Sequence, residues 1–197
     1  MPLPISIAPG TVQWDSLPVL KLKHYPFTEG SYKPYTLARV CIQGDSLLVR
    51  LWSFEAETLV DETDMLSGSC IHLFLKKGDT CLAVTVAAGG GFKAQADKGE
   101  GFVPLYELSS GIPDTQWFGG EDLQGIYWGC EVTLGPEIIR DLFGTRCLLP
   151  GSEFLANVTK TQFDPQHFHY GSLFQINERE PAFYLPASLG EFSVVNY

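Results

Sequence analysis

Apolar stretches with alternating polarity, paired across short turns, dominate this chain of 197 residues. The stretches TLARVCIQ (36–43) and SLLVRLWSF (46–54) flank Gly44-Asp45, while SCIHLFLK (69–76) and TCLAVTVAA (80–88) flank Lys77-Gly78-Asp79. Stretches rich in β-branched and aromatic residues on either side of a glycine-containing turn are typical of antiparallel hairpins. The pattern therefore predicts two hairpins and a chain built mainly of strands.

The rest of the chain adds more strands and one helix. The stretch IYWGCEVTL (126–134) alternates with period two, and FLANVTKTQF (154–163) and EFSVV (191–195) are further predicted strands. The segment LGPEIIRDLFG predicts a helix, because Pro136 suits its first position and Gly144 its end. Many strands and a single short helix predict an all-β fold, an antiparallel β-sandwich of jelly-roll-like form.

Two glycine-containing regions, 89–101 and 109–125, are predicted to be irregular connections or hairpin tips. An apolar content of 45% and a charged content of 18% are globular values. With no internal repeat and no linker, residues 1–197 are predicted to form one β-sandwich domain.

The charge of the chain disfavours two classes of partner. Thirteen basic and 23 acidic side chains give a formal charge of −10, which repels nucleic-acid phosphates and anionic membranes. The five cysteines lack CxxC spacing and lie mostly in apolar stretches, as expected of buried thiols. With no signal peptide visible at the first residues, a reduced, cytoplasmic protein is expected, unless the given sequence has been trimmed.

In their order along the chain, these segments resemble the type 9 carbohydrate-binding module family of the DOMON-like superfamily, over roughly residues 35–195. The resemblance rests on GDSLLVRLWSFE, SCIHLFL, YWGCEVTLGPEIIRDLFG, FLANVTKT, and HYGSLFQI followed by FYLPASLGEF. It implies a β-sandwich that binds sugar non-catalytically, pinching it between two aromatic rings while polar side chains contact the hydroxyls.

The chain departs from that family at several site positions. Leu66 stands where the first ring is expected, His72 where the strand usually carries an acid, and Leu173 where a Trp is usual. Phe183 keeps the position of the second ring. The resemblance thus implies the fold with a largely rewritten sugar site.

Six residues are the predicted ligand contacts. Phe183, Tyr184 and Trp117 would stack on a sugar, and Asn157, Lys160 and His169 would bond its hydroxyls. Asn157 belongs to a strand face of alternating polar residues, for which a solvated outer face is the alternative interpretation. Trp117 lies in the predicted Gly-rich loop DTQWFGGED and is expected to replace the missing ring if the site has moved.

Metal and catalytic chemistry have less support. Asp61, Glu62 and Asp64 lie in an acidic stretch that is a weak candidate for a structural calcium, but its spacing is not that of an EF-hand. His167 and His169 are two apart, and two ligands do not complete a metal site. No GxSxG elbow or phosphate loop occurs, so no catalytic residue and no cofactor are predicted.

The sequence therefore predicts non-catalytic binding of a carbohydrate or a similar small polar ligand. The alternative is an interaction or scaffold protein that kept the sandwich and lost the sugar site, for which a protein partner is expected. A third reading is a hydrolase with paired carboxylates whose separation the sequence does not give.

Overall fold

The computed structural model describes residues 1–28, 30–55, 57–144 and 146–196. Thirteen strands, one α-helix and four short 3-10 helices lie in this described part of the chain. In chain order they are β1 (Leu3–Ile7), η1 (Trp14–Ser16), β2 (Leu20–Lys21), β3 (Tyr35–Gln43), β4 (Ser46–Phe54), η2 (Met65–Ser67), β5 (Cys70–Lys77), β6 (Thr80–Ala87), β7 (Phe92–Asp97), β8 (Val103–Pro104), η3 (Leu105–Glu107), β9 (Asp114–Asp122), β10 (Gly125–Leu134), α1 (Pro136–Phe143), β11 (Glu153–Gln162), β12 (His169–Ser172), η4 (Pro186–Ser188) and β13 (Gly190–Val195).

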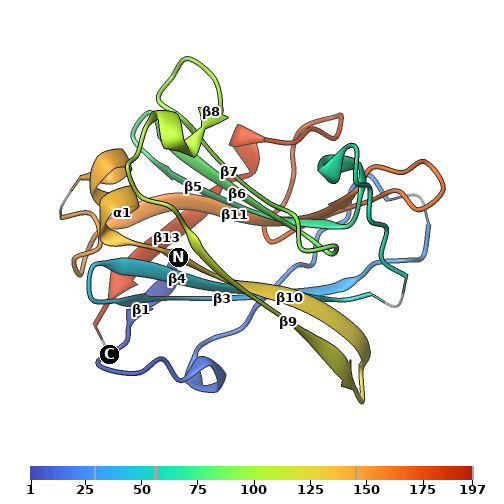
Figure 1. Ribbon diagram of the computed structural model, residues 1–197, viewed down its shortest axis with the longest axis horizontal. Coiled ribbons are helices and arrows are strands. Elements are labelled where there is room, and N and C mark those ends of the chain that lie inside the picture. The colour runs from blue at the N-terminus through green and yellow to red at the C-terminus, as the bar shows by residue number, and fades with distance from the viewer. Residues whose placement is uncertain (29, 56, 145, 197) are drawn as a thin grey trace.

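The strands form one hydrogen-bonded path, β8-β7-β6-β5-β11-β13-β1-β3-β4-β10-β9, with β12 beside β11 and β2 beside β3. This path curls over on itself into two layers (Figure 1). The upper layer in Figure 1 consists of β8, β7, β6, β5 and β11, with β12 beside β11. The lower layer consists of β3, β4, β10 and β9, with β2 beside β3. The predicted all-β sandwich with one short helix is confirmed.

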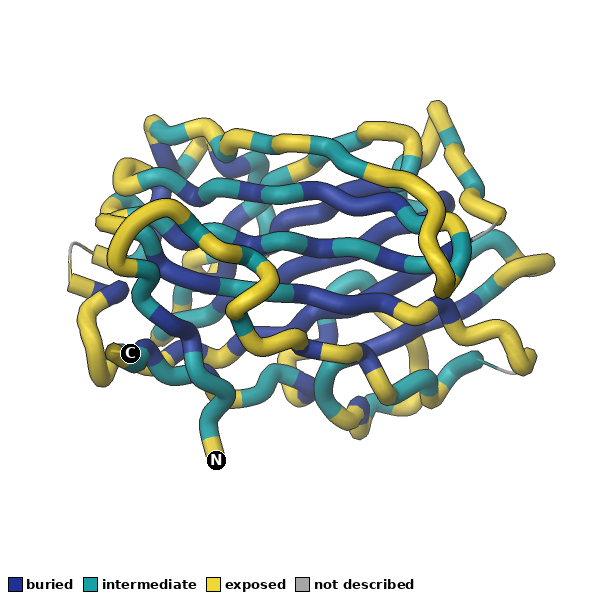
Figure 2. The backbone as a smooth tube through the Cα atoms, turned by 90° about the horizontal axis from the view of Figure 1, so that it is seen from below, coloured by how far each residue is buried: buried dark blue, intermediate teal, exposed yellow. Residues whose placement is uncertain are grey.

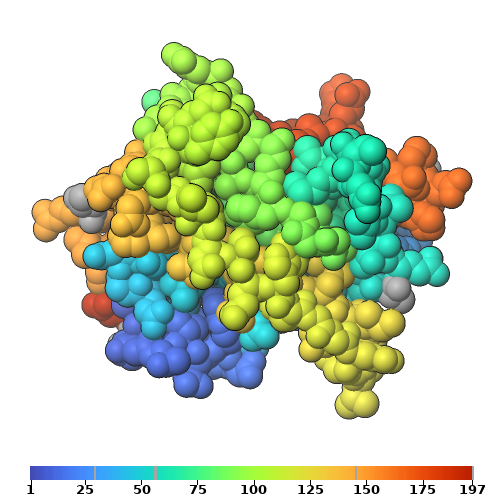
Figure 3. All heavy atoms as spheres, in the orientation of Figure 1, coloured from blue at the N-terminus to red at the C-terminus, as the bar shows by residue number. Residues whose placement is uncertain are grey.

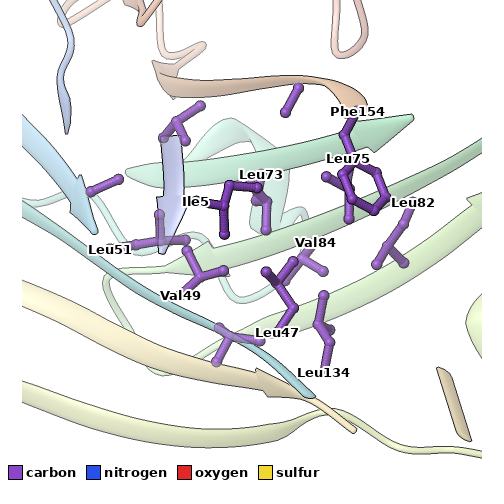
Figure 4. Packing of buried hydrophobic residues seen from close by; sticks show 14 of the residues in the cluster. Ile5, Leu47, Val49, Leu51, Leu73, Leu75, Leu82, Val84, Leu134 and Phe154 are labelled. Atoms are coloured by element: carbon purple, nitrogen blue, oxygen red, sulfur yellow. The ribbon is translucent and has the colours of Figure 1, made fainter. Parts of the chain in front are cut away.

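The core lies between the layers, because the strands of each layer direct one of their faces inward. Leu73 and Leu75 of β5 point inward from above, and Leu47, Val49 and Leu51 of β4 meet them from below (Figure 4). All five are buried, and burial runs along the middles of the strands while the connections at their ends are exposed (Figure 2). Each buried aliphatic side chain of this size stabilises the fold by about 2 kcal/mol.

The join between the layers was not predicted. β1 pairs in parallel with β13 on one side and with β3 on the other, so it bridges the two halves. Leu3 lies opposite Phe192, and Ser6 lies opposite both Val195 and Cys41. The chain therefore carries two parallel pairings in a sandwich that the sequence predicted to be wholly antiparallel.

The predicted hairpins and helix are confirmed. β3 and β4 pair around Gly44, and β5 and β6 pair around Gly78. Both glycines have positive φ, 58° and 59°, a conformation that a side chain disfavours. α1 begins at Pro136, and Gly144 follows its last residue.

Among the described residues no helix is long and apolar enough to cross a membrane.

The two regions predicted to be irregular contain strands instead. β7 lies in the first and pairs with β6, and β9 lies in the second and pairs with β10 along nine residue pairs. Glycines mark the ends of β7, whereas Gly119 and Gly120 lie inside β9. Local glycine content was thus outweighed by pairing with a strongly alternating neighbour.

Candidate functional site

The outer face of the upper layer is crossed by residues 173–189, which we call the closing segment. Phe183 contacts His72 and Phe74 of β5 edge-on, with ring centroids 5.3 Å apart in both cases. Tyr184 also contacts Phe74, at 5.3 Å. The aromatic pair at the end of the closing segment therefore packs on the middle of β5, and Figure 3 shows the segment's red atoms along the upper edge of the molecule.

A polar row runs across the strands beneath this segment. Ser172, Thr159, His72, Thr85 and Lys93 are direct cross-strand neighbours on β12, β11, β5, β6 and β7. Directly opposed residues share one face of a sheet. The row therefore begins beneath the closing segment and ends at Lys93 of β7, whose side chain is exposed.

His72 is the fixed centre of the row. Its Nδ1 is 2.8 Å from Thr85 Oγ1 and its Nε2 is 2.7 Å from Thr161 Oγ1. Burial, and secondarily the charge of Lys160, lower the pKa of His72 to about 3. A neutral imidazole has one donor and one acceptor nitrogen, and the two threonine hydroxyls satisfy both. His72 therefore holds the two threonines in place, and neither of its ring nitrogens is left to bond a ligand.

The surface beside the row combines aromatic and polar groups. Phe102, from the β7–β8 connection, lies 5.9 Å from Phe183 and 5.2 Å from Tyr184, measured between centroids. Lys93 shares the face of His72, and Gln95 shares the face of Phe74, both through β6. Phe183, Tyr184, Phe102 and Gln95 are half-buried and Lys93 is exposed. We call these five residues the closing face.

Three members of the closing face were missed by the sequence reasoning. Phe102, Lys93 and Gln95 lie in or next to the stretch interpreted as a flexible connection. The alternation of Phe92, Ala94 and Ala96 against the polar residues between them was the available signal. Ala96 is fully buried, which confirms that this side of β7 faces the core.

Asn157 holds the closing segment in place and does not reach the surface. Its Nδ2 donates to the Ser188 carbonyl and lies 2.9 Å from Ser172 Oγ, whose hydroxyl is also 3.2 Å from Asn157 Oδ1. The residue is 1% exposed. The prediction that Asn157 bonds a ligand directly is therefore corrected: its amide is fully used inside the protein.

Lys160 lies inside the sandwich, on the core side of β11. Its Nζ donates to Glu55 Oε1 at 3.1 Å, and both side chains are 0% exposed. Glu55 also accepts from Trp128 Nε1 at 2.9 Å and from Ser69 Oγ at 3.2 Å. Burial lowers the pKa of Lys160, while the charge of Glu55 opposes that shift. The buried pair makes Lys160 a structural residue, not the predicted ligand contact.

His169 belongs to the same buried network. Lys160 Nζ lies 3.0 Å from His169 Nε2, and His169 Nδ1 lies 3.0 Å from the His167 carbonyl oxygen. An ammonium group only donates, so Nε2 accepts from it and Nδ1–H donates to the carbonyl. Burial and the adjacent Lys160 charge lower the pKa of His169 to about 3. Like Lys160, it is not available for the predicted ligand bond.

Trp117 lies in β9 and not in a loop. Its position opposite Cys130 of β10 directs it to the core side, and it is half-buried against the core. The prediction of an exposed loop aromatic was therefore wrong, because β9 extends through the glycines on which the loop prediction rested. Leu66, at the family's first ring position, is half-buried in η2.

The acidic stretch before η2 uses its carboxylates internally. Asp61 Oδ1 accepts from Thr63 N, Thr63 Oγ1 and Asp64 N, and Asp64 accepts from Leu66 N and Ser67 Oγ. Glu62 is exposed beside them. The described residues contain no group of three His, Cys, Asp or Glu side chains that could hold a metal.

The sulfur atoms offer little nucleophilic chemistry. All five cysteines are free and buried, as expected from their apolar settings. Burial raises the pKa of Cys70 to about 12, and its thiol donates to the Met65 carbonyl oxygen. Because the thiolate is the nucleophile, Cys70 is inert at neutral pH although His72 lies two residues away on the same face.

Comparison with known proteins finds no matching family model and no matching curated sequence. Solved structures do match. A candidate carbohydrate-binding protein of Bacteroides uniformis has a TM-score of 0.73 and 16% identity, covering 98% of each chain.

A carbohydrate-binding module of family 9 from Caldicellulosiruptor kristjanssonii, solved with cellotriose and also with glucose, has a TM-score of 0.67 and 9% identity. That match covers all of this chain and 95% or 97% of the module. The chain therefore has the fold of family 9 carbohydrate-binding modules, and the resemblance read from the sequence is confirmed at the level of fold.

Proposed function

We propose that this protein is a non-catalytic carbohydrate-binding module. The observation that carries the proposal is the fold, shared over the whole chain with modules that were solved with cellotriose and glucose bound. The inert cysteines and the fully bonded His72 favour binding over catalysis.

The closing face is the proposed site. Phe183 and Phe102 offer apolar ring surface for the C–H side of a sugar, as sugar sites require. Lys93 and Gln95 lie on the same face of the sheet as His72 and Phe74, on which Phe183 packs, and supply donors and an acceptor for hydroxyl groups. Tyr184, which was predicted to stack on the sugar, packs against Phe102 and is proposed to add to this ring surface.

The test is calorimetric titration with glucose and cellotriose of the wild type and of Phe183→Ala. Loss of an aromatic anchor costs on the order of 2 kcal/mol, so the variant is expected to bind at least about tenfold more weakly. Tyr35→Ala is the matched control, because Tyr35 is an exposed aromatic on β3 of the other layer. Equal affinity of the Phe183 variant and the wild type would refute the site, and the absence of any sugar binding would refute the function.

A second candidate function, protein interaction, is favoured by the outer face of the lower layer. Tyr35, Phe54 and Tyr127 form a row of rings there, with centroids 5.7 and 5.4 Å apart. Tyr35 is exposed and the other two rings are half-buried, and contiguous apolar patches often mark interaction surfaces. Light scattering of the purified protein tests this reading, since a self-associating surface gives a dimer that Phe54→Ser weakens.

A further inference from the structure

A groove lies at the end of the sandwich away from α1, between one wall that contains Phe27, Thr28, Gly30 and Tyr32 and a second wall formed by the β11–β12 connection, residues 163–168. Its volume is about 580 Å³, and its aromatic lining residues are Phe27, Tyr32, Phe163 and Phe168. In Figure 3 the orange atoms of the β11–β12 connection project at the right-hand edge. The groove is separate from the closing face, with which it shares no lining residue.

The two walls of the groove are joined to each other through Tyr170. Its backbone N donates to Thr28 Oγ1 at 3.2 Å, and its buried ring contacts Phe27 and Phe163 edge-on at 5.5 and 6.4 Å. Its hydroxyl donates to the Ala182 carbonyl oxygen at 3.1 Å. The aromatic walls are therefore fixed before any ligand arrives, which lowers the entropy cost of binding.

The β11–β12 connection is stabilised by hydrogen bonds of its own. Asp164 Oδ1 accepts from Gln166 N at 2.9 Å, and the Asp164 carbonyl accepts from His167 N at 3.1 Å. His167 Nδ1 lies 3.4 Å from the Asp164 carboxylate. These bonds fix the backbone that presents the exposed side chains of Gln166 and His167 to the groove.

One wall of the groove rests on the buried network. Tyr32, which lines the groove, packs edge-on against His169 at 5.8 Å between centroids. His169 is in turn held by Lys160 Nζ, and Lys160 by Glu55. The buried pair of Lys160 and Glu55 thereby holds His169 in place, and His169 supports the exposed ring of Tyr32 in the groove.

The lining of the groove selects a class of ligand. A volume within the range of roughly 300–1,000 Å³, with rings and a few polar groups, is typical of a small-molecule site. Thr28, Gln166 and His167 supply hydrogen-bonding groups, and the described lining residues include no lysine or arginine. With a formal charge of −10 on the chain, an anionic ligand is disfavoured. Aromatic surface with neutral polar groups fits an uncharged sugar ring.

We propose that this groove is a second carbohydrate subsite, which binds a neutral sugar residue independently of the closing face. The proposal rests on the proposed carbohydrate-binding function. It predicts two separate sets of perturbed residues when a short neutral oligosaccharide is added.

The test is a nuclear magnetic resonance titration of the ¹⁵N-labelled protein with cellotriose, maltotriose and xylotriose. The reporters are the amides of Thr28, Gly30, Gln166 and His167 for the groove, and those of Lys93 and Gln95 for the closing face. In the wild type both sets are expected to shift. In Tyr32→Ala the groove shifts are expected to need at least a tenfold higher sugar concentration, while the closing-face shifts keep their midpoint; Phe183→Ala is expected to do the reverse.

The variants are chosen so that folding does not decide the result. Tyr32 is 46% exposed, and Gln166→Ala changes an exposed polar side chain, so it provides a second, milder perturbation of the groove. Tyr35→Ala is the matched tyrosine control and is expected to leave both sets unchanged. Groove shifts alone would support this proposal and refute the closing face as the site.

Two outcomes would overturn the proposal. Shifts confined to Lys93 and Gln95, unaffected by Tyr32→Ala, would refute the groove while leaving the proposed function standing. No shift in either set with any of the three sugars would refute both.

Discussion

Replacing Lys160 with methionine removes the ammonium group from the buried network and leaves the carboxylate of Glu55 inside the sandwich. Methionine keeps the length and much of the volume of lysine, so the change acts mainly on charge. In the folded protein Glu55 would retain its bonds from Trp128 Nε1 and Ser69 Oγ, both of which come from neutral donors.

The expected cost follows from the burial of the pair. Breaking a buried ion pair by removing one partner costs about 3–5 kcal/mol. Because two neutral donors remain on Glu55, the loss is expected near 3 kcal/mol. In the double variant Glu55→Gln with Lys160→Met no charge stays buried, so about half of that loss or more is expected to be recovered.

Urea denaturation of the wild type, both single variants and the double variant measures these free energies of unfolding in one cycle. Asp15→Asn is the control, because Asp15 pairs with Arg39 but is fully solvent-exposed, and it is expected to change stability little. Two outcomes would refute the view that Lys160 and Glu55 form a coupled ion pair. One is that the losses in the free energy of unfolding of the two single variants add up to the loss of the double variant, and the other is that Lys160→Met is as stable as the wild type.

Three further predictions follow from the described contacts. His72 and His169 have folded pKa values of about 3 against an ordinary value of 6.5. Below pH 6.5 the unfolded chain therefore binds protons that the folded chain does not, so stability is complete above pH 6.5. It is expected to fall by about 1.4 kcal/mol per pH unit for each histidine down to pH 3; a free energy of unfolding that stays flat between pH 6 and pH 4 would contradict this. Asn157→Ala leaves the Ser188 carbonyl oxygen without its donor and is expected to cost about 1–3 kcal/mol and to speed hydrogen exchange at the Ser188 amide, unlike Asn177→Ala at an exposed site. In Gly129→Ala the new Cβ collides with the Leu51 carbonyl oxygen and the Phe118 ring, so thermal unfolding is expected to show a loss of about 1–3 kcal/mol; Gly120→Ala meets only the outer atoms of Tyr127 and should be much milder, and equal losses would contradict the steric argument.

The strands that could be predicted from the sequence are those whose side chains distinguish the face toward the core from the face toward solvent. In β10 the apolar residues Trp128, Cys130, Val132 and Leu134 recur every second position, so the core side is evident from the sequence. In β9, Gly119 and Gly120 carry no side chain, and the strand forms because β10 offers it a complete set of hydrogen-bonding groups. β1 pairs with residues near the other end of the chain, and no local pattern indicates such a contact.

Only Phe183 and Tyr184 of the closing face were among the residues predicted from the sequence. The resemblance placed Phe183, and the structure shows it on the middle of β5. The polar face of β11 was expected to be open, but it is covered by the closing segment, which turns Asn157 into an anchor. Lys160 follows the inward-facing Val158 by two positions, so its burial could have been inferred; its partner Glu55 is 105 residues away, and that distance hides the pair from sequence reasoning.

The parallel join of β1 to β13 has a kinetic consequence. It brings residue 3 against residue 192, so this pairing depends on a contact between two residues that are far apart in the sequence. Hairpins such as β3–β4 are able to form on their own while the chain is still being made, since they close over two residues. The two halves of the sandwich, by contrast, are unable to lock together until the last strand has left the ribosome. Folding is therefore expected to be slow, as in other chains dominated by long-range strand pairing.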